Sequence, residues 1–210
     1  MPFSQPARTT TRRIRIRRTR VAGLLVVIAA IAATLGYQSL ASSSSTAASP
    51  IDARRREHRA PGEADGAVPH GTTVFDDEIP AVANLDPALL RALRRAATDA
   101  AGDRVEFVVD SGWRSPAYQE RLLHEAISKY GSEQKAARWV ATPKTSAHVS
   151  GDAVDVGSAA TAWLSEHGAA YGLCQIYGNE PWHYELRPEA VDRGCPPMYD
   201  DPTHDPRMQH

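Results

Sequence analysis

Two histidines and two carboxylates in the C-terminal half of the sequence have the side-chain types of a metal-dependent hydrolase site. His148 and Asp155 lie seven residues apart in SAHVSGDAVD, and His183 follows Glu180 by three residues in EPWH. Two imidazoles and a carboxylate are a common ligand set for catalytic zinc, which keeps one coordination position open for water. A further carboxylate near the metal, here Glu180, could accept a proton from that water and deliver it to a leaving amine. The pattern therefore indicates hydrolytic chemistry at a zinc ion.

Spacing alone leaves other interpretations of these residues open. Asp152 is the main rival to Asp155 as a ligand, although alternation along a strand puts the two on opposite faces. His148 could instead be a surface loop histidine, Asp155 a carboxylate that caps a turn, and His183 a packed strand residue. Histidines on predicted helices or in the tail are expected to have no role in the site: His124, His167, His204 and His210.

Arg114 is a further candidate, because it follows a predicted strand in the segment SGWRS. A guanidinium in a loop beside a metal site suits a substrate carboxylate or the oxyanion of a tetrahedral intermediate. We therefore include Arg114 among the catalytic candidates.

The elements that would position these residues are helices in the first part of the domain and short strands in the second. Asp86 is an N-cap candidate before Pro87, and the apolar face of the segment that follows predicts an amphipathic helix. This order predicts an α+β fold in which a small antiparallel sheet is flanked by helices. Helices are predicted at 87–100, 116–130, 133–140 and 159–167, strands at 104–110, 151–157, 173–177 and 182–186, and a loop at 141–150.

The N-terminal third has the composition of a membrane-targeting segment and a spacer. Residues 1–20 carry seven arginines and no acidic residue, and residues 21–37 carry no charge. Seventeen apolar residues are near the lower limit for spanning a bilayer, and the arginines predict a cytoplasmic N-terminus. We expect a single-pass signal anchor at 21–37 in a cytoplasmic membrane, with the domain outside. The alternative is a signal peptide that is cleaved near Ala41, which would release a secreted protein.

The predicted domain boundaries follow from the composition of the remaining chain. Residues 38–72 are rich in Ser, Ala, Pro, Gly and Arg without periodicity, which predicts a flexible linker. The domain is expected at 73–196 and a C-terminal tail at 197–210. Of the 24 basic residues, 17 remain outside the basic end against 25 acidic residues. An acidic body repels phosphates, so no nucleic-acid partner is expected.

Cys174 and Cys195 are the two cysteines of the chain. An even number of cysteines in an exported domain favours a disulfide, which would attach the C-terminal segment to the fold. Two unpaired thiols are the alternative.

Three ordered motifs resemble the VanY-type D-alanyl-D-alanine carboxypeptidases, in the wider group with lysostaphin-like and hedgehog-like zinc folds. The motifs are SGWRS with a following Gln119, then SAHVSGDAVDV, then YGLCQIYGNEPWHYE. The resemblance covers 111–184. It implies a Zn²⁺ cofactor with His148, Asp155 and His183 as ligands, Glu180 as the catalytic base, Arg114 at the substrate or oxyanion, and Ser146 and Gln119 in the substrate pocket.

The function implied by the resemblance is hydrolysis of the terminal D-Ala-D-Ala bond of peptidoglycan stem peptides, by a protein expected to be a monomer. One alternative is a peptidoglycan endopeptidase on the same scaffold, and another is a non-catalytic zinc-containing module that binds the cell wall. Many relatives have Ser-Glu-His where this chain has Ser146-Ala147-His148. The ligand is kept while an adjacent carboxylate is missing, which affects the expected substrate preference.

Overall fold

The structure is a computed structural model that describes residues 61–209. The predicted basic end 1–20, the predicted anchor 21–37 and the linker up to residue 60 lie outside the described residues. Among residues 61–209, none of the helices has the length and apolar character needed to cross a bilayer. The anchor and the linker therefore stay predictions.

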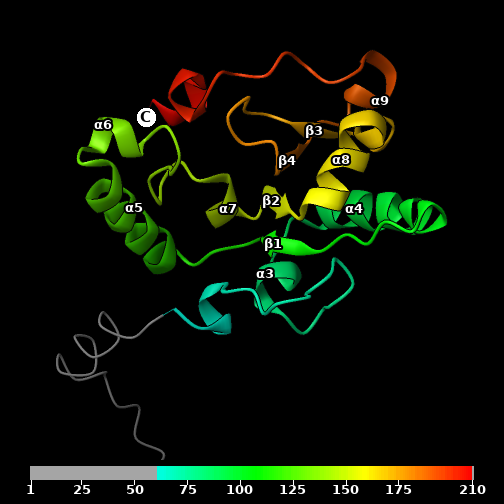
Figure 1. The fold of residues 1–210 in the computed structure, drawn as a ribbon, viewed down its shortest axis with the longest axis horizontal. Coiled ribbons are helices and arrows are strands. Elements are labelled where there is room, and N and C mark those ends of the chain that lie inside the picture. Colours follow the sequence, from blue (N-terminus) through cyan, green and yellow to red (C-terminus); the bar gives the residue numbers. More distant parts are fainter. Residues whose placement is uncertain (1–60, 210) are drawn as a thin grey trace, which may run out of the picture. The chain divides into compact units, whose positions relative to one another are not determined.

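The fold is built on a four-stranded antiparallel sheet with the strand order β1-β2-β4-β3 (Figure 1). The strands are β1 (Val109–Ser111), β2 (Ala153–Val156), β3 (Leu173–Gln175) and β4 (His183–Leu186). Helices and strands follow one another along the chain, and the predicted α+β class with a small antiparallel sheet is confirmed. The two central strands, β2 and β4, carry two of the three candidate metal ligands.

Two long helices begin and end at residues that favour helix termini. Asp86 caps α4 (Pro87–Ala100), because its side chain accepts hydrogen bonds from the first-turn amides of Ala88 and Leu89. Ser115 caps α5 (Pro116–Tyr130) in the same way, through the amide of Tyr118. Both helices therefore begin at the prolines at which the sequence predicts their first turns.

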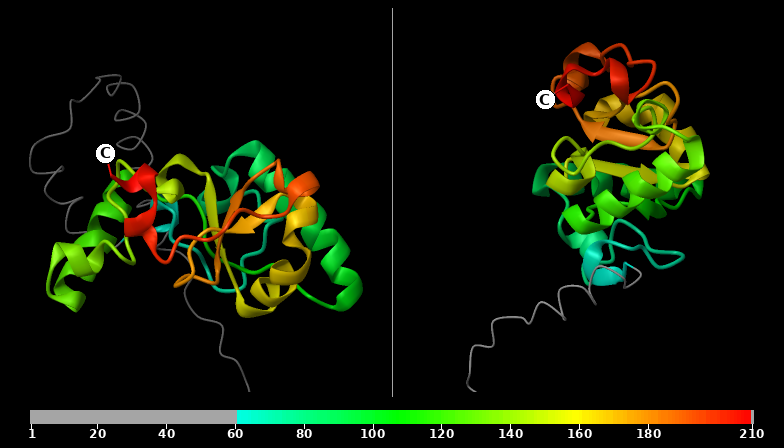
Figure 2. Two further views of the ribbon diagram at one scale, coloured as in Figure 1. Left: turned by 90° about the horizontal axis from the view of Figure 1, so that it is seen from above. Right: turned by 90° about the vertical axis from the view of Figure 1, so that its left-hand side faces the viewer.

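The helices gather at the two ends of the sheet. In Figures 1 and 2, α4 and α8 (Ser158–His167) lie toward one end of the sheet, and α5 and α6 (Glu133–Ala136) lie toward the other. The remaining α-helices of the described chain are short: α3 (Pro80–Ala83), α7 (Ala147–Ser150) and α9 (Ala190–Arg193). The main core joins α4 to the sheet through Leu89, Leu93, Val109, Val154 and Tyr184, which are at most 2% exposed. Burial of these side chains supplies the hydrophobic stabilisation that holds α4 against the sheet.

Several element boundaries differ from the sequence predictions. The strand predicted at 104–110 begins only at Val109, because Arg104 adopts a left-handed conformation (φ 63°) and closes a 3₁₀ turn. The helix predicted at 133–140 ends at Ala136. The predicted loop 141–150 contains α7, which places His148 on a helical turn rather than in a loop.

The packed region also extends beyond the predicted boundaries of the domain. The composition assigns 61–72 to the flexible linker, yet the Asp65 carbonyl accepts a hydrogen bond from the Ser115 amide, and Thr72 is 5% exposed. At Gly66 (φ 97°) a Cβ atom would lie 2.1 Å from the Trp113 carbonyl oxygen, so only glycine allows this close approach. These residues pack through backbone contacts, which leave no periodic pattern of apolar side chains. The sequence therefore contains no sign that they belong to the domain.

The predicted tail is likewise part of the fold. Asp201 and Asp205 are at most 1% exposed, and His204, for which no role was expected, lies 3.2 Å from Asp201 through its Nδ1. Figure 1 shows this segment, coloured orange to red, returning from α9 across the molecule toward α6. The segment 197–210 is rich in polar residues, and such a composition is the same for a packed segment as for a free tail.

Candidate functional site

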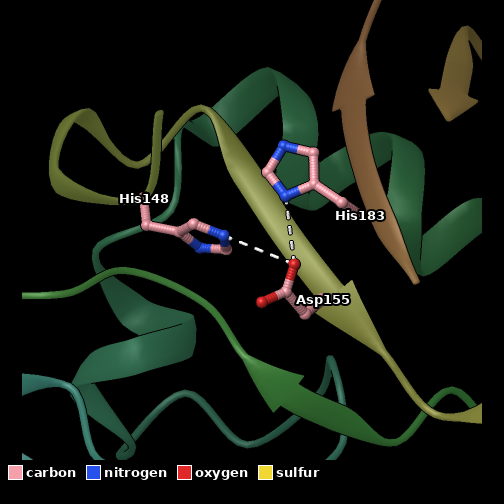
Figure 3. Close-up of side chains that lie close together, drawn as sticks. All are labelled: His148, Asp155 and His183. Carbon is pink, nitrogen blue, oxygen red and sulfur yellow. Dashed lines mark hydrogen bonds and ion pairs between the residues drawn. The ribbon is translucent and has the colours of Figure 1, made fainter. Parts of the chain in front are cut away.

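His148, Asp155 and His183 converge, although two of them are separated by 35 residues of sequence (Figure 3). Asp155 Oδ1 lies 3.0 Å from His183 Nδ1 and 3.3 Å from His148 Nε2. All three residues are buried, and one ligand atom from each lies within 4.8 Å of the others. Atoms that share a zinc ion at about 2 Å are necessarily within about 4 Å of one another. The cluster therefore has the donor types and nearly the spacing of a metal centre.

The sheet and α7 position these three side chains. Asp155 and His183 are Cα partners in the β2–β4 ladder, so both project from one face of the sheet. Gly151 (φ 82°) ends α7 and turns the chain into β2, which brings His148 next to Asp155. A Cβ atom on Gly151 would lie 2.5 Å from the Asn84 carbonyl oxygen, so the turn requires glycine.

The second nitrogen of each histidine is occupied by a hydrogen-bond acceptor. His148 Nδ1 lies 2.8 Å from the Gly112 carbonyl oxygen, and His183 Nε2 lies 3.4 Å from Glu185 Oε1. An N–H at these positions leaves the lone pairs of His148 Nε2 and His183 Nδ1 directed at the cluster. Metal-binding histidines usually donate their other N–H to a carbonyl or carboxylate in this way.

Burial and neighbouring charges shift the pKa values of the cluster in different directions. Burial, together with Arg114, lowers the pKa of His148, which favours the neutral imidazole. Burial opposes ionisation of Asp155, but the two imidazoles hold its pKa well below the usual range. Burial likewise opposes protonation of His183, yet hydrogen bonds to Asp155 and Glu185 raise its pKa to about 9. Without a metal, His183 therefore holds a proton that an incoming cation must displace.

Glu180 lies beside the cluster: its backbone carbonyl accepts a hydrogen bond from the His183 amide at 3.1 Å, while among residues 61–209 its carboxylate makes none to the three ligand candidates. Its Oε2 is 3.9 Å from His183 Nδ1, and the residue is 7% exposed. Burial is the main cause that raises the pKa of Glu180 to about 7. A carboxyl group with a pKa near neutrality can both accept and return a proton.

Arg114 makes contacts that connect the cluster to a cavity of about 280 Å³. Its Nη2 donates to Asp155 Oδ2 at 2.9 Å, and its Nη1 donates to Gln119 Oε1 at 3.2 Å. The Gln119 amide in turn donates to the Ala141 carbonyl, which fixes its orientation. The cavity is lined by the three ligand candidates and by the other candidate site residues, Arg114, Gln119, Ser146 and Glu180.

Two further sequence expectations can be compared with this geometry. Asp152, the rival ligand, is exposed and lies outside the cluster, because it precedes β2 on the turn after α7. Cys174 and Cys195 are joined by a disulfide with an S–S distance of 2.02 Å.

Sequence reasoning missed two residues near the cluster, Glu185 and Arg207. Glu185 is two positions after His183 in β4, so strand alternation could have placed both on one face. Arg207 contacts Glu185 from the C-terminal segment, and no local pattern in the sequence signals that contact.

Comparison with known proteins places this site in a family context. The model of the family "VanY: D-alanyl-D-alanine carboxypeptidase" matches residues 82–189, just over half of the 210 residues. A D-alanyl-D-alanine carboxypeptidase of Enterococcus faecalis (strain ATCC 700802 / V583) is 31% identical, over 40% of this chain and 41% of the relative. The chain thus spans about two fifths of the length of that curated relative.

Two solved structures are also similar. One is a vancomycin-resistance D,D-pentapeptidase VanY variant in complex with Zn(II), with a TM-score of 0.45 and 28% identity over 49% of this chain and 72% of that chain. The other is VanYB in complex with D-alanine-D-alanine, with a TM-score of 0.48 and 25% identity over 52% of this chain and 74% of that chain. From the extent of the family match, the chain belongs to the VanY family of D-alanyl-D-alanine carboxypeptidases.

Proposed function

We propose that the protein is a zinc-dependent D,D-carboxypeptidase that removes the terminal D-alanine from peptidoglycan stem peptides. The observation that carries the proposal is the convergence of His148, Asp155 and His183 beside a buried carboxylate and a cavity. Membership of the VanY family supports the reaction and the substrate class. One of the two similar solved structures holds Zn(II) and the other holds D-alanine-D-alanine, which are the metal and the dipeptide unit that the proposal assigns to this chain.

The residues of the cluster fit a zinc ion. The donor set is two imidazole nitrogens and one carboxylate oxygen. Such a set suits zinc, whereas magnesium and calcium prefer sites made of oxygen atoms alone. An acceptor holds the second nitrogen of each histidine, so His148 Nε2 and His183 Nδ1 face the cluster and can bind zinc once His183 has released its proton. When bound, zinc supplies Lewis acidity that activates water and polarises a carbonyl.

Glu180 moves the proton in the proposed reaction. Its Oε2 accepts a proton as water attacks the carbonyl carbon of the penultimate D-alanine, and later delivers it to the nitrogen of the departing D-alanine. The position of Oε2, 3.9 Å from His183 Nδ1, keeps this carboxylate near the reacting atoms but outside the ligand set. Its raised pKa, about 7, suits both directions of transfer.

Arg114 binds negative charge on the substrate side of the cavity. Its guanidinium can orient the terminal carboxylate of the peptide or stabilise the developing oxyanion. Gln119 accepts a hydrogen bond from Nη1 of that guanidinium, and Ser146 adds a hydroxyl to the wall of the cavity.

The decisive experiment compares Glu180→Gln with the unchanged protein on a peptide that ends in D-Ala-D-Ala. Wild-type protein is expected to release free D-alanine, and the variant is expected to keep stoichiometric zinc while turnover falls by at least about 100-fold. Full turnover in the variant would refute the role of Glu180. Shortening of cross-linked muropeptides without release of free alanine would indicate an endopeptidase instead, and zinc binding without any cleavage a non-catalytic module.

We also propose that residues 21–37 anchor the protein in a bacterial cytoplasmic membrane and that the domain acts as a monomer outside it. The basis is the uncharged run after seven arginines, together with a substrate that lies outside that membrane. Fractionation of cells that express the tagged chain tests this topology, since a cleaved signal peptide would place the shortened protein in the medium.

A further inference from the structure

Glu185 is a buried carboxylate that the proposed reaction does not use. It is 1% exposed and lies on β4, two residues after His183. Its Oε1 lies 3.4 Å from His183 Nε2, on the opposite side of the imidazole from the cluster. The orientation of Glu185 therefore bears directly on the orientation of the His183 ring.

Arg207 of the C-terminal segment holds this carboxylate by both oxygens. Its Nη1 donates to Glu185 Oε2 at 2.7 Å, and its Nη2 donates to Oε1 at 3.1 Å. Two parallel contacts between a guanidinium and a carboxylate fix the plane of the carboxylate as well as its position. The Oε1 atom that Arg207 holds is the same atom that faces His183.

A second arginine, Arg187, contacts only one oxygen of the same carboxylate. Arg187 Nη2 donates to Glu185 Oε2 at 2.7 Å, and no contact from Arg187 to Oε1 is present among the described residues. Arg187 thus helps to neutralise Glu185 without fixing the oxygen that faces His183. The two arginines together offset the cost of a buried carboxylate.

The segment that carries Arg207 is attached to the body of the domain at several points. Asp205 accepts a hydrogen bond from Tyr177 Oη at 3.0 Å, and Asp201 accepts one from Arg138 Nε at 2.8 Å. Tyr199 bridges to Tyr177 next to the loop that leads to Glu180. These attachments hold Arg207 over β4 rather than on a free end.

We infer that Arg207, acting through Glu185, is a positioning residue for His183, so that the segment 201–209 supports the metal centre. The inference rests on the proposed function, because it takes His183 as a zinc ligand. The chain beyond the motifs of the family is then required for full metal affinity.

The test measures zinc affinity in the full chain by competition with a chromogenic chelator. Arg207→Ala is expected to weaken zinc binding by about 10-fold or more, the range seen when a residue that orients a ligand is lost. Arg207→Lys keeps the charge but not the paired contacts, so its zinc affinity is expected to lie between those of wild type and Arg207→Ala. In the cobalt(II)-loaded proteins, the visible absorption of Arg207→Ala should change, because the geometry of the ligands changes.

Two matched arginine variants separate positioning from general attachment of the segment. Arg138→Ala removes the ion pair to Asp201, and Arg187→Ala removes a contact to Oε2 only. Both are expected to keep the zinc dissociation constant within about twofold and to keep the cobalt spectrum, since neither arginine contacts the Glu185 Oε1 atom that faces His183. Thermal unfolding of each metal-free variant identifies any loss of the fold, in which case Arg207→Lys carries the test.

The outcomes are distinguishable. If Arg207→Ala binds zinc like wild type, or if Arg138→Ala loses as much affinity, the inference is overturned while the proposed function stands. If wild-type protein binds no zinc, the proposed metal site fails and the inference fails with it. A selective loss in Arg207→Ala, with partial recovery in Arg207→Lys, supports the inference.

Discussion

Asp155 and His183 are directly opposed partners across the β2–β4 ladder, and Asp155 Oδ1 lies 3.0 Å from His183 Nδ1. Directly opposed residues of an antiparallel pair project from the same face, and a one-residue slip would send one of them to the other face. Because the core behind this ladder is fully buried, such a slip is strongly disfavoured. The register thus sets two of the three ligand positions before any metal binds.

The first prediction separates Asp155 from its neighbour Asp152. Asp155→Ala is expected to weaken zinc binding by more than about 100-fold, because residues that only hydrogen-bond to ligands already account for up to that much. Asp152→Ala is the matched control, since this carboxylate is exposed and lies outside the cluster. Metal content after dialysis against a weak chelator provides the measurement. Unchanged zinc in Asp155→Ala, or loss in Asp152→Ala, would contradict the assignment of the ligand.

A second prediction concerns Arg114 and the terminal carboxylate of the substrate. Arg114→Lys, assayed at saturating zinc, is expected to lower kcat/KM by about 10- to 100-fold, because the planar guanidinium is lost. Arg95→Lys, on the exposed side of α4, is expected to change nothing. A peptide with a C-terminal amide in place of the carboxylate provides a sharper test. If Arg114 binds the carboxylate, amidation and the substitution should not be additive, whereas additive losses would point to the oxyanion instead.

Much of the fold and of the cluster was predictable because the signals are local. Asp86 and Ser115 cap their helices through contacts within three residues. Strand alternation favours Asp155 over Asp152 as the ligand, and the structure excludes Asp152 because it precedes β2 and is exposed. The contact between Arg207 and Glu185 spans 22 residues and depends on the path of the C-terminal segment. Side-chain chemistry alone does not specify such a path. The left-handed Arg104, which delays β1, is equally invisible because glycine or asparagine usually occupies that conformation.

A third prediction concerns the disulfide between Cys174 and Cys195. The bond closes a segment with a sequence separation of 21 residues, for which the chain-entropy estimate of stabilisation is about 3 kcal/mol. Cys195→Ser breaks the bond at its exposed end and leaves the buried Cys174 in place. The free energy of unfolding, measured with denaturant, should fall by about that amount. Reduction of the wild-type protein should produce the same fall, and a reduced protein as stable as the oxidised one would exclude a stabilising role.

The last prediction is a pH dependence at Asp201, which is 1% exposed and anchors the C-terminal segment. Burial opposes ionisation, but hydrogen bonds from Thr203, Arg138 and His204 outweigh it and lower the pKa of Asp201 to about 2. A folded-state pKa below the unfolded value, about 3.9, means that the contribution is complete above pH about 4 and disappears as the pH falls toward 2. The shift corresponds to about 2 kcal/mol of stability at neutral pH.

Asp201→Asn removes this contribution and therefore tests it. At pH 7 the variant should be less stable than wild type by about 2 kcal/mol, and the difference should shrink as the pH is lowered from about 4 to about 2. Asp192→Asn, an exposed position in α9, is the matched control and should unfold like wild type at every pH. A difference between Asp201→Asn and wild type that stays constant across this range would mean that the carboxylate acts through its shape and neutral hydrogen bonds. Convergence of the two unfolding curves in acid would instead assign the stabilisation to its charge.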